Sequence, residues 1–155
     1  KNGTAKGSLK LNKNEVSYTT DLKIGSSVGK SNGTISFKEG FNINYESENV
    51  NFSDIESLAD IPFAGSLKIN GNTKGDSSYG EIDAAISTQD AEIDRFRVGS
   101  FYSKLDYKSG HLSFNKISGK LGKSDYTGDV AFDFNQGQIQ ATAQSQNILL
   151  TIQSR

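Results

Sequence analysis

Apolar and polar residues alternate along most of this 155-residue chain, and this alternation limits what the chain can fold into. Between Val16 and Ile24, every second residue is Val, Tyr, Thr, Leu or Ile. A strand points successive side chains to opposite faces, so the pattern predicts strands with one buried and one exposed face. Similar runs continue to Ile152, and we count roughly eleven or twelve short strands. The sequence therefore predicts an all-β protein whose strands are mostly antiparallel.

Glycine-containing segments divide the alternating runs and are the predicted turns. They are Asn32–Gly33 and residues 38–40, 70–72, 109–110 and 135–137. Residues 53–62 are the one predicted helix, because Ser53 can cap it, Glu56 completes a capping box and Pro62 stops it. Residues 90–98 fit either a strand or a helix, and we favour a strand.

Composition argues against a chemical site. The chain has no Cys, which excludes disulfides and thiolate ligands, and His111 is its only histidine. The letters GKS occur twice, but a phosphate-binding loop needs glycine where Ile24 and Ile117 stand, so we expect two turns, at 29–31 and 122–124. We place His111 on the polar side of a strand, without a second metal ligand nearby. We expect no catalysis, no metal and no cofactor.

Charged residues form blocks of opposite sign. Residues 1–40 and 95–155 are mainly basic and residues 41–94 mainly acidic, and the net charge is −1. A nucleic-acid-binding domain usually carries one continuous basic surface, so we expect no nucleic acid partner. The blocks instead predict charge pairs between neighbouring strands.

Internal repetition indicates how the chain is organised. The segment INYESENVNFSDI, from Ile43, superposes on LDYKSGHLSFNKI, from Leu105. A block with a tyrosine, an acid and an alternating run starts at Tyr18, Tyr79 and Tyr126. Only apolar and turn positions are retained, which predicts a repeated hairpin rather than an active site. The block at Tyr79 is one residue shorter, which predicts a bulge there.

These repeats describe a single β domain over residues 1–155, with hairpin repeats near 16–60, 61–104 and 105–152. The chain starts at Lys1 and contains no methionine, so we expect it to be a fragment of a longer repetitive protein.

Three segments carry a resemblance to a known family. DIPFAGSLKINGN (60–72), ISGKLGKSDYTGDVAFDF (117–134) and NGTISFKEGFNI (32–43) resemble the strand units of the AsmA-like and TamB-like proteins of the Gram-negative envelope. In that family, hairpins of the patterns G-x-L-x-L-x-x-G and Y-x-G-x-[VIL]-x-[LF] follow one another over long stretches. The resemblance extends from about Leu9 to Ile152.

The resemblance implies a long sheet curled lengthwise into an open, apolar groove (a β-taco) in the periplasm. It implies that the groove shields or conducts phospholipid acyl chains between the inner and outer membranes. The full-length protein would then be anchored in the inner membrane outside this segment, and would have a BamA-like outer-membrane barrel as a possible partner.

A groove also follows from the size of the sheet. Twelve strands spaced ~4.8 Å apart give a sheet about 55 Å long, and too little helix is predicted to cover one face. Either the sheet closes on itself, as a β-sandwich or β-solenoid serving as an adhesive or scaffolding module, or its trough holds a guest such as an acyl chain. The predicted groove residues are Leu9, Leu11, Tyr18, Leu22, Ile24, Phe37, Ile43, Tyr45, Val50, Phe52, Leu67, Ile69, Ile82, Ile86, Leu105, Tyr107, Leu112, Phe114, Val130, Phe132, Phe134, Ile139 and Leu150.

Overall fold

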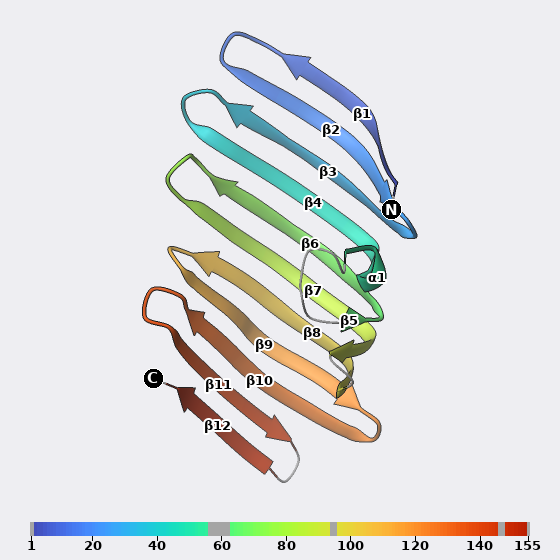
Figure 1. Ribbon diagram of the computed structural model, residues 1–155, viewed down its shortest axis with the longest axis vertical. Helices are drawn as coiled ribbons and strands as arrows, with labels where there is room; N and C mark the ends of the chain where they lie inside the picture. Colours follow the sequence, from blue (N-terminus) through green and yellow to red (C-terminus); the bar gives the residue numbers. More distant parts are fainter. Residues whose placement is uncertain (1, 56–62, 94–95, 146–147, 155) are drawn as a thin grey trace.

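The computed structural model is one large antiparallel sheet with a single turn of helix (Figure 1). It describes residues 2–55, 63–93, 96–145 and 148–154. The strands are β1 (Gly3–Leu11), β2 (Glu15–Ile24), β3 (Ser27–Ser36), β4 (Gly40–Asn51), β5 (Phe63–Ala64), β6 (Ser66–Gly75), β7 (Gly80–Ile93), β8 (Phe96–Lys108), β9 (His111–Leu121), β10 (Ser124–Asp133), β11 (Gln138–Ser145) and β12 (Ile148–Ser154), and the helix is α1 (Phe52–Ile55).

The strands follow one another across the sheet in the order of the sequence. Consecutive strands pair antiparallel from β1 to β4 and from β6 to β12, and β4 pairs with β6. The short strand β5 lies outside this order and pairs with β7. The prediction of an all-β, antiparallel protein is confirmed. The sheet is not closed or strongly curled: among the described strands, pairing links only neighbours, and β1 never meets β12. The closed sandwich and the solenoid are therefore wrong, and so is the strong lengthwise curl of the predicted β-taco.

Strand register divides the side chains into two faces, because directly paired residues point to the same side. One continuous row of paired residues defines the apolar face, and the adjacent row defines the polar face. The apolar row is Leu9, Tyr18, Gly33, Ile43, Thr73, Ile82, Tyr107, Leu112, Phe132 and Ile139. The polar row is Lys10, Ser17, Thr34, Asn42, Lys74, Glu81, Lys108, His111, Asp133 and Gln138.

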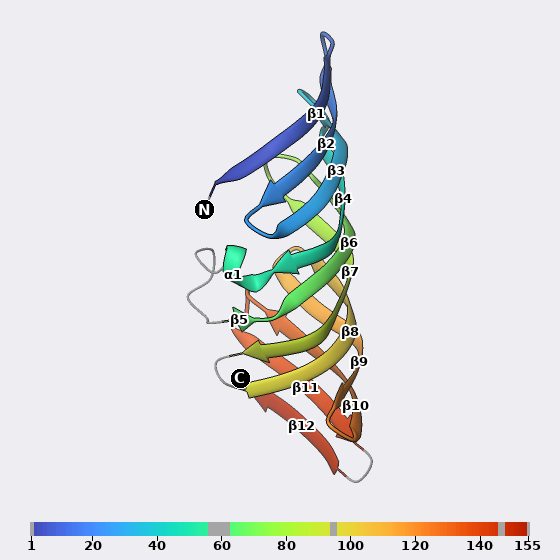
Figure 2. The same cartoon turned by 90° about the vertical axis from the view of Figure 1, so that its right-hand side faces the viewer.

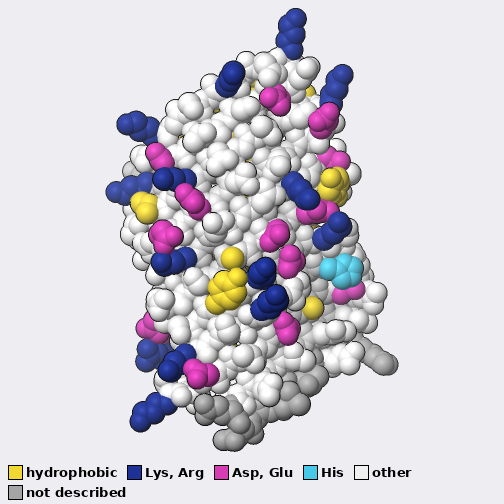
Figure 3. Space-filling model, turned by 180° about the vertical axis from the view of Figure 1, so that it is seen from behind, with side chains coloured by type: hydrophobic (Ala, Val, Ile, Leu, Met, Phe, Trp, Pro, Cys, Tyr) yellow, Lys and Arg dark blue, Asp and Glu magenta, His cyan; other side chains and the backbone are white. Residues whose placement is uncertain are grey.

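The sheet is bent as well as twisted. Figure 2 shows both rims turning toward the side on which α1 and β5 lie, while the sheet stays open. The view from behind shows the other side, over which charged side chains of both signs and the histidine are spread (Figure 3). The apolar face is therefore the concave one.

One carboxylate of α1 forms hydrogen bonds with the turn between β2 and β3. Asp54 Oδ2 accepts hydrogen bonds from the backbone N–H and hydroxyl of Ser26, at 2.8 and 3.0 Å, and from those of Ser27, both at 2.9 Å. This explains why a helix of only four residues holds its place. The helix predicted over 53–62 is confirmed only at its start, since residues 56–62 lie outside the described part.

Three predicted turns are wrong. Asn32–Gly33 lies inside β3 and residues 70–72 lie inside β6, whereas 38–40, 109–110 and 135–137 are at turns. The GKS at 29–31 also lies within β3. In these strands glycine allows close approach: a Cβ at Gly33 would lie 2.5 Å from the carbonyl oxygen of Asn42, and one at Gly71 would lie 2.6 Å from the Cβ of Ala84.

The repeat is not a repeated hairpin. Residues 105–117 form the end of β8, a turn and the start of β9, but residues 43–51 run through β4 as one strand. The positions that turn in the second copy form a bulge in the first, between Ser47 and Val50. The bulge predicted at the Tyr79 block is also absent, because β6 and β7 pair without a register shift from Gly75–Gly80 to Leu67–Thr88. Residues 90–93 and 96–98 are strand, as favoured.

We expect Gly119→Ala to lower the free energy of unfolding by about 1–3 kcal/mol. The Tyr126 ring lies across Gly119, with its hydroxyl donating to the Val98 carbonyl at 3.1 Å, and a Cβ on residue 119 would overlap this ring. Gly80→Ala is the matched control, since a Cβ there meets nothing within 4 Å. Urea denaturation measures both variants, and an equal loss in the two would contradict the role assigned to Gly119.

Candidate functional site

The concave apolar face is the candidate site. All the predicted groove residues lie in strands except Phe37 and Phe134, which lie in turns, and Phe52, which begins α1. Register places the strand residues on the apolar face, from Leu9 on β1 to Ile139 on β11. Leu150 on β12 pairs with Ala143. The side chains of Leu150 and Phe52 lie outside the described part. The sequence thus identified one shared surface.

Among the described residues, α1 and β5 are the elements that lie on the concave side of this face (Figure 2). In this part of the chain, the only buried apolar side chains are Ala84, Ile86 and Ala91. They lie on β7, in the middle of the sheet, and Ile86 is 7% exposed whereas Leu9 on the edge strand is 70% exposed. A folded protein normally buries its large apolar side chains in a core. Here the described apolar side chains of the face that would be the core are half-buried or exposed apart from these few.

Aromatic rings line part of the apolar face. Phe114 meets Phe132 edge to face, with ring centroids 6.5 Å apart, and Phe132 stacks on Phe134 at 6.3 Å. These rings lead from β9 through β10 to the turn after β10. Such contacts stabilise the pairs by about 0.5–1.5 kcal/mol beyond the area they bury.

The polar groups of the apolar face are satisfied within the protein. The Ser31 hydroxyl lies 2.9 Å from the Tyr18 hydroxyl and donates to the Asn44 carbonyl, and Ser103 donates to the Asn115 carbonyl. Among the described residues, no buried side-chain nitrogen or oxygen lacks a partner. In this part of the chain, the apolar face therefore shows no buried polar side-chain atom that lacks a partner within the protein.

The polar face carries charge pairs between strands, which confirms the prediction made from the blocks of charge. Glu81 on β7 accepts from Lys108 on β8 at 2.6 Å and pairs with Lys74 on β6 at 3.3 Å. His111 lies on this face as predicted, with Nε2 3.1 Å from Asp133 Oδ2. These rows run across the face seen in Figure 3.

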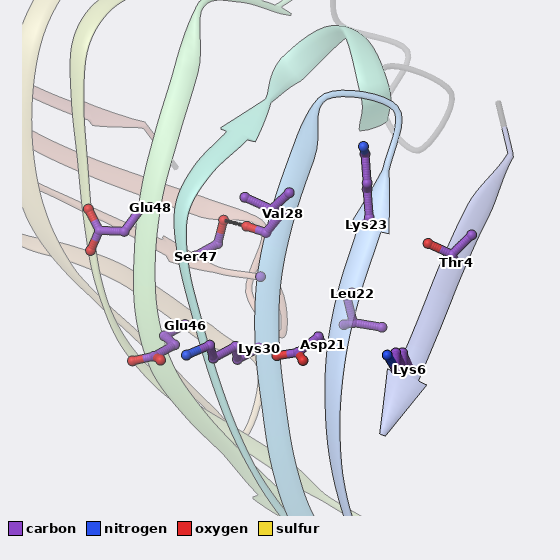
Figure 4. A pocket seen from close by; sticks show the side chains of 11 residues that line it. Thr4, Lys6, Asp21, Leu22, Lys23, Val28, Lys30, Glu46, Ser47 and Glu48 are labelled. Carbon is purple, nitrogen blue, oxygen red and sulfur yellow. Dashed lines mark hydrogen bonds between the residues drawn. The ribbon is translucent and has the colours of Figure 1, made fainter. Parts of the chain in front are cut away.

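A hollow of about 460 Å³ lies over β1 to β4 (Figure 4). Most of its lining belongs to the polar face, where Lys6, Asp21, Lys30 and Glu46 are paired in register and alternate in sign. Opposite charges in neighbouring strands offset one another, so the hollow has no excess of either sign in this row. It offers no convergent group for chemistry, and it does not coincide with the predicted groove.

The described residues contain no group of three or more His, Cys, Asp or Glu that could hold a metal ion. No helix in this part of the chain has the length and apolar character to cross a membrane. Compared with protein-family models, curated proteins and solved structures, the sequence matches none. The function proposed below therefore rests on the geometry of the two faces of the sheet.

The pKa of Glu81 is held below its usual value of 4.5, first by the hydrogen bond from Lys108 and then by that from Lys74. Ionised Glu81 therefore stabilises the fold above pH 4.5, and this contribution is lost as pH falls through the lowered pKa. We expect Glu81→Gln to be less stable than wild type at neutral pH, with the difference vanishing on acidification. Denaturant unfolding across the acid range tests this, and a difference that persists in acid would contradict it.

Proposed function

We propose that this domain holds the acyl chains of phospholipid on its concave apolar face. The observation that supports the proposal is the apolar face itself, which runs across the sheet and whose large side chains are half-buried in the middle of the sheet and exposed toward its edge. Each methylene that leaves water gains about 0.8 kcal/mol and needs no polar partner. An acyl chain is therefore the ligand class whose chemistry this surface matches.

The shape of the sheet suits an extended guest. The bend leaves the concave side open along the sheet (Figure 2), so a long chain can lie across several strands. The bent sheet acts as an open groove, in the sense that the AsmA-like and TamB-like resemblance implies, although it is less curled. In this proposal the lipid is shielded from water while its headgroup stays outside the sheet.

The resemblance supplies the cellular setting of the proposal. The domain is one segment of a longer periplasmic β-groove protein that is anchored in the inner membrane. Such a protein shields or conducts phospholipid between the two membranes and supports assembly of the outer membrane, possible partners including a BamA-like barrel. The domain itself binds without catalysis, and it needs no cofactor and no nucleic acid.

We expect Phe132→Glu to lower the amount of co-purified phospholipid at least tenfold, because it places a charge on the apolar face. Ala131→Glu is the matched control: residue 131 is the neighbour on β10, pairs with Ser113 and Gln140, and is exposed on the polar face. Native extraction and lipid mass spectrometry measure the bound lipid, and circular dichroism checks that both variants keep their strands.

Three results would count against the proposal. Wild-type protein that is free of lipid and refuses added phospholipid would overturn it. So would equal loss of lipid in the two variants. A second copy covering the apolar face, seen as a lipid-free dimer in light scattering, would replace lipid as the occupant.

A further inference from the structure

One long rim of the sheet carries exposed apolar side chains. β1, β3, β6, β8 and β10 run in the same direction, so the turns that follow them share a rim (Figure 1). Leu11 ends β1, Phe37 follows β3, Tyr79 ends the turn after β6 and Phe134 follows β10. Their exposed fractions are 66%, 62%, 53% and 62%. We call these four residues the apolar rim.

The backbone of this rim is fixed. The Phe37 N–H donates to the Asn14 carbonyl in the neighbouring turn at 2.9 Å, and the Phe134 N–H donates to the Gly110 carbonyl at 2.9 Å. These bonds join the turns of adjacent hairpins in pairs. The backbone of Phe37 and that of Phe134 therefore have defined positions on the rim.

In four of the rim turns, one side chain accepts hydrogen bonds from the backbone of the same turn. Each of these side chains accepts two or more such bonds, and the residues are Asn12, Ser36, Asp76 and Asp133. Backbone groups that are already paired lower the cost of leaving water. These bonds reduce the number of unpaired backbone donors that the apolar rim would carry into a less polar medium.

The rim turns carry no net charge. Lys13 and Lys38 are offset by Glu39 and Asp76, and the turns at 109–110 and 134–137 have no charged residue. At the opposite rim, the described turns Gly25–Ser26 and Gly122–Lys123 contain no apolar side chain, and the strand-end residues Ile24 and Leu121 beside them are 42% and 46% exposed. Among the described residues, the two long rims therefore differ in the apolar residues of their turns and in how exposed their strand-end apolar residues are.

The apolar rim is continuous with the apolar face. Phe134 stacks on Phe132, which in turn meets Phe114 on β9. An acyl chain crossing the rim at Phe134 would pass from ring to ring onto the concave side without meeting a charged group on this path.

We propose that the apolar rim rests on the surface of a phospholipid bilayer with zwitterionic headgroups, and that acyl chains reach the apolar face across it; the second part rests on the function proposed above. Aromatic side chains favour the interface between headgroups and acyl chains. The rim extends about 38 Å, from β1 to β10, at ~4.8 Å per strand. Single apolar side chains separated by polar turns suit a fluid surface, whereas a protein partner needs a contiguous buried patch.

Tryptophan fluorescence tests the contact, because the chain contains no Trp. We prepare Phe37→Trp, Phe134→Trp and, on the opposite rim, Leu121→Trp, where residue 121 is 46% exposed. The probe is a phosphatidylcholine vesicle with brominated acyl chains. We expect blue-shifted and quenched emission at residues 37 and 134, little change at 121, and no dependence on salt, since a neutral contact is not screened.

A second variant measures the strength of the contact. We expect Phe37→Ser combined with Phe134→Ser to lower vesicle binding about tenfold in flotation, since each ring buries apolar area at the interface. Leu121→Ser is the control and should bind as wild type. Phospholipid already held by the purified protein is measured in parallel for Tyr79→Ser, whose side chain lies on the rim and outside the predicted groove, and it should not fall in that variant.

The outcomes separate the two proposals. Unchanged emission at residues 37 and 134 with lipid still bound to the apolar face overturns the rim and leaves the function standing. Emission shifts in a protein that holds no lipid support the bilayer contact and overturn the acyl-chain function. Binding that needs anionic lipid and disappears in salt overturns the neutral rim, as does an equal response at residue 121.

Discussion

Backbone hydrogen bonds between neighbouring strands are the interaction on which this structure depends. Among the described residues only Ala84, Ile86 and Ala91 are buried apolar side chains, so packing in a core contributes little. Each strand from β2 to β11 except β5 instead pairs along both sides. Because an antiparallel ladder keeps paired side chains on one side, it also assembles the apolar face. The backbone thus both holds the sheet together and builds the candidate site.

Large and small residues pair across neighbouring strands on the apolar face. Gly33 and Gly71 pair directly with Tyr18 and Tyr45, and Gly119 pairs with Tyr126. At Gly119 the tyrosine ring lies over the glycine. A ring laid over glycine fills the gap left by the missing side chain and supports the strand pair.

The sequence predicted the faces well because strand alternation is local. From Val16 to Ile24, period two alone determines which side chains share a side, and pairing then extends this to the whole sheet. Glycine was ambiguous, since Gly33 permits close approach within a strand whereas Gly110, with φ at 81°, makes a turn. The similar sequences 43–55 and 105–117 also adopt different structures, because the neighbouring strands determine whether the chain forms a bulge or a hairpin.

Other features could be identified only from the three-dimensional structure. Asp54 reaches residues 26 and 27, far away in the sequence, and nothing in the acidic run around it marks that contact. The apolar rim depends on strand direction, which brings Leu11, Phe37, Tyr79 and Phe134 to one side of the sheet. Their sequence signal is weak: Asn12, Ser36, Asp76 and Asp133 each lie within three residues of one of them.

The strictly sequential strand order makes the length of this protein adjustable. Since each strand pairs only with its neighbours, a hairpin could be added or removed with disturbance confined to the adjoining strands. Each such hairpin would change the reach of the sheet by about 9.6 Å, or two strand spacings. The number of hairpins then sets the length of the apolar face and of the rim beside it, and this length could change without redesign of a core.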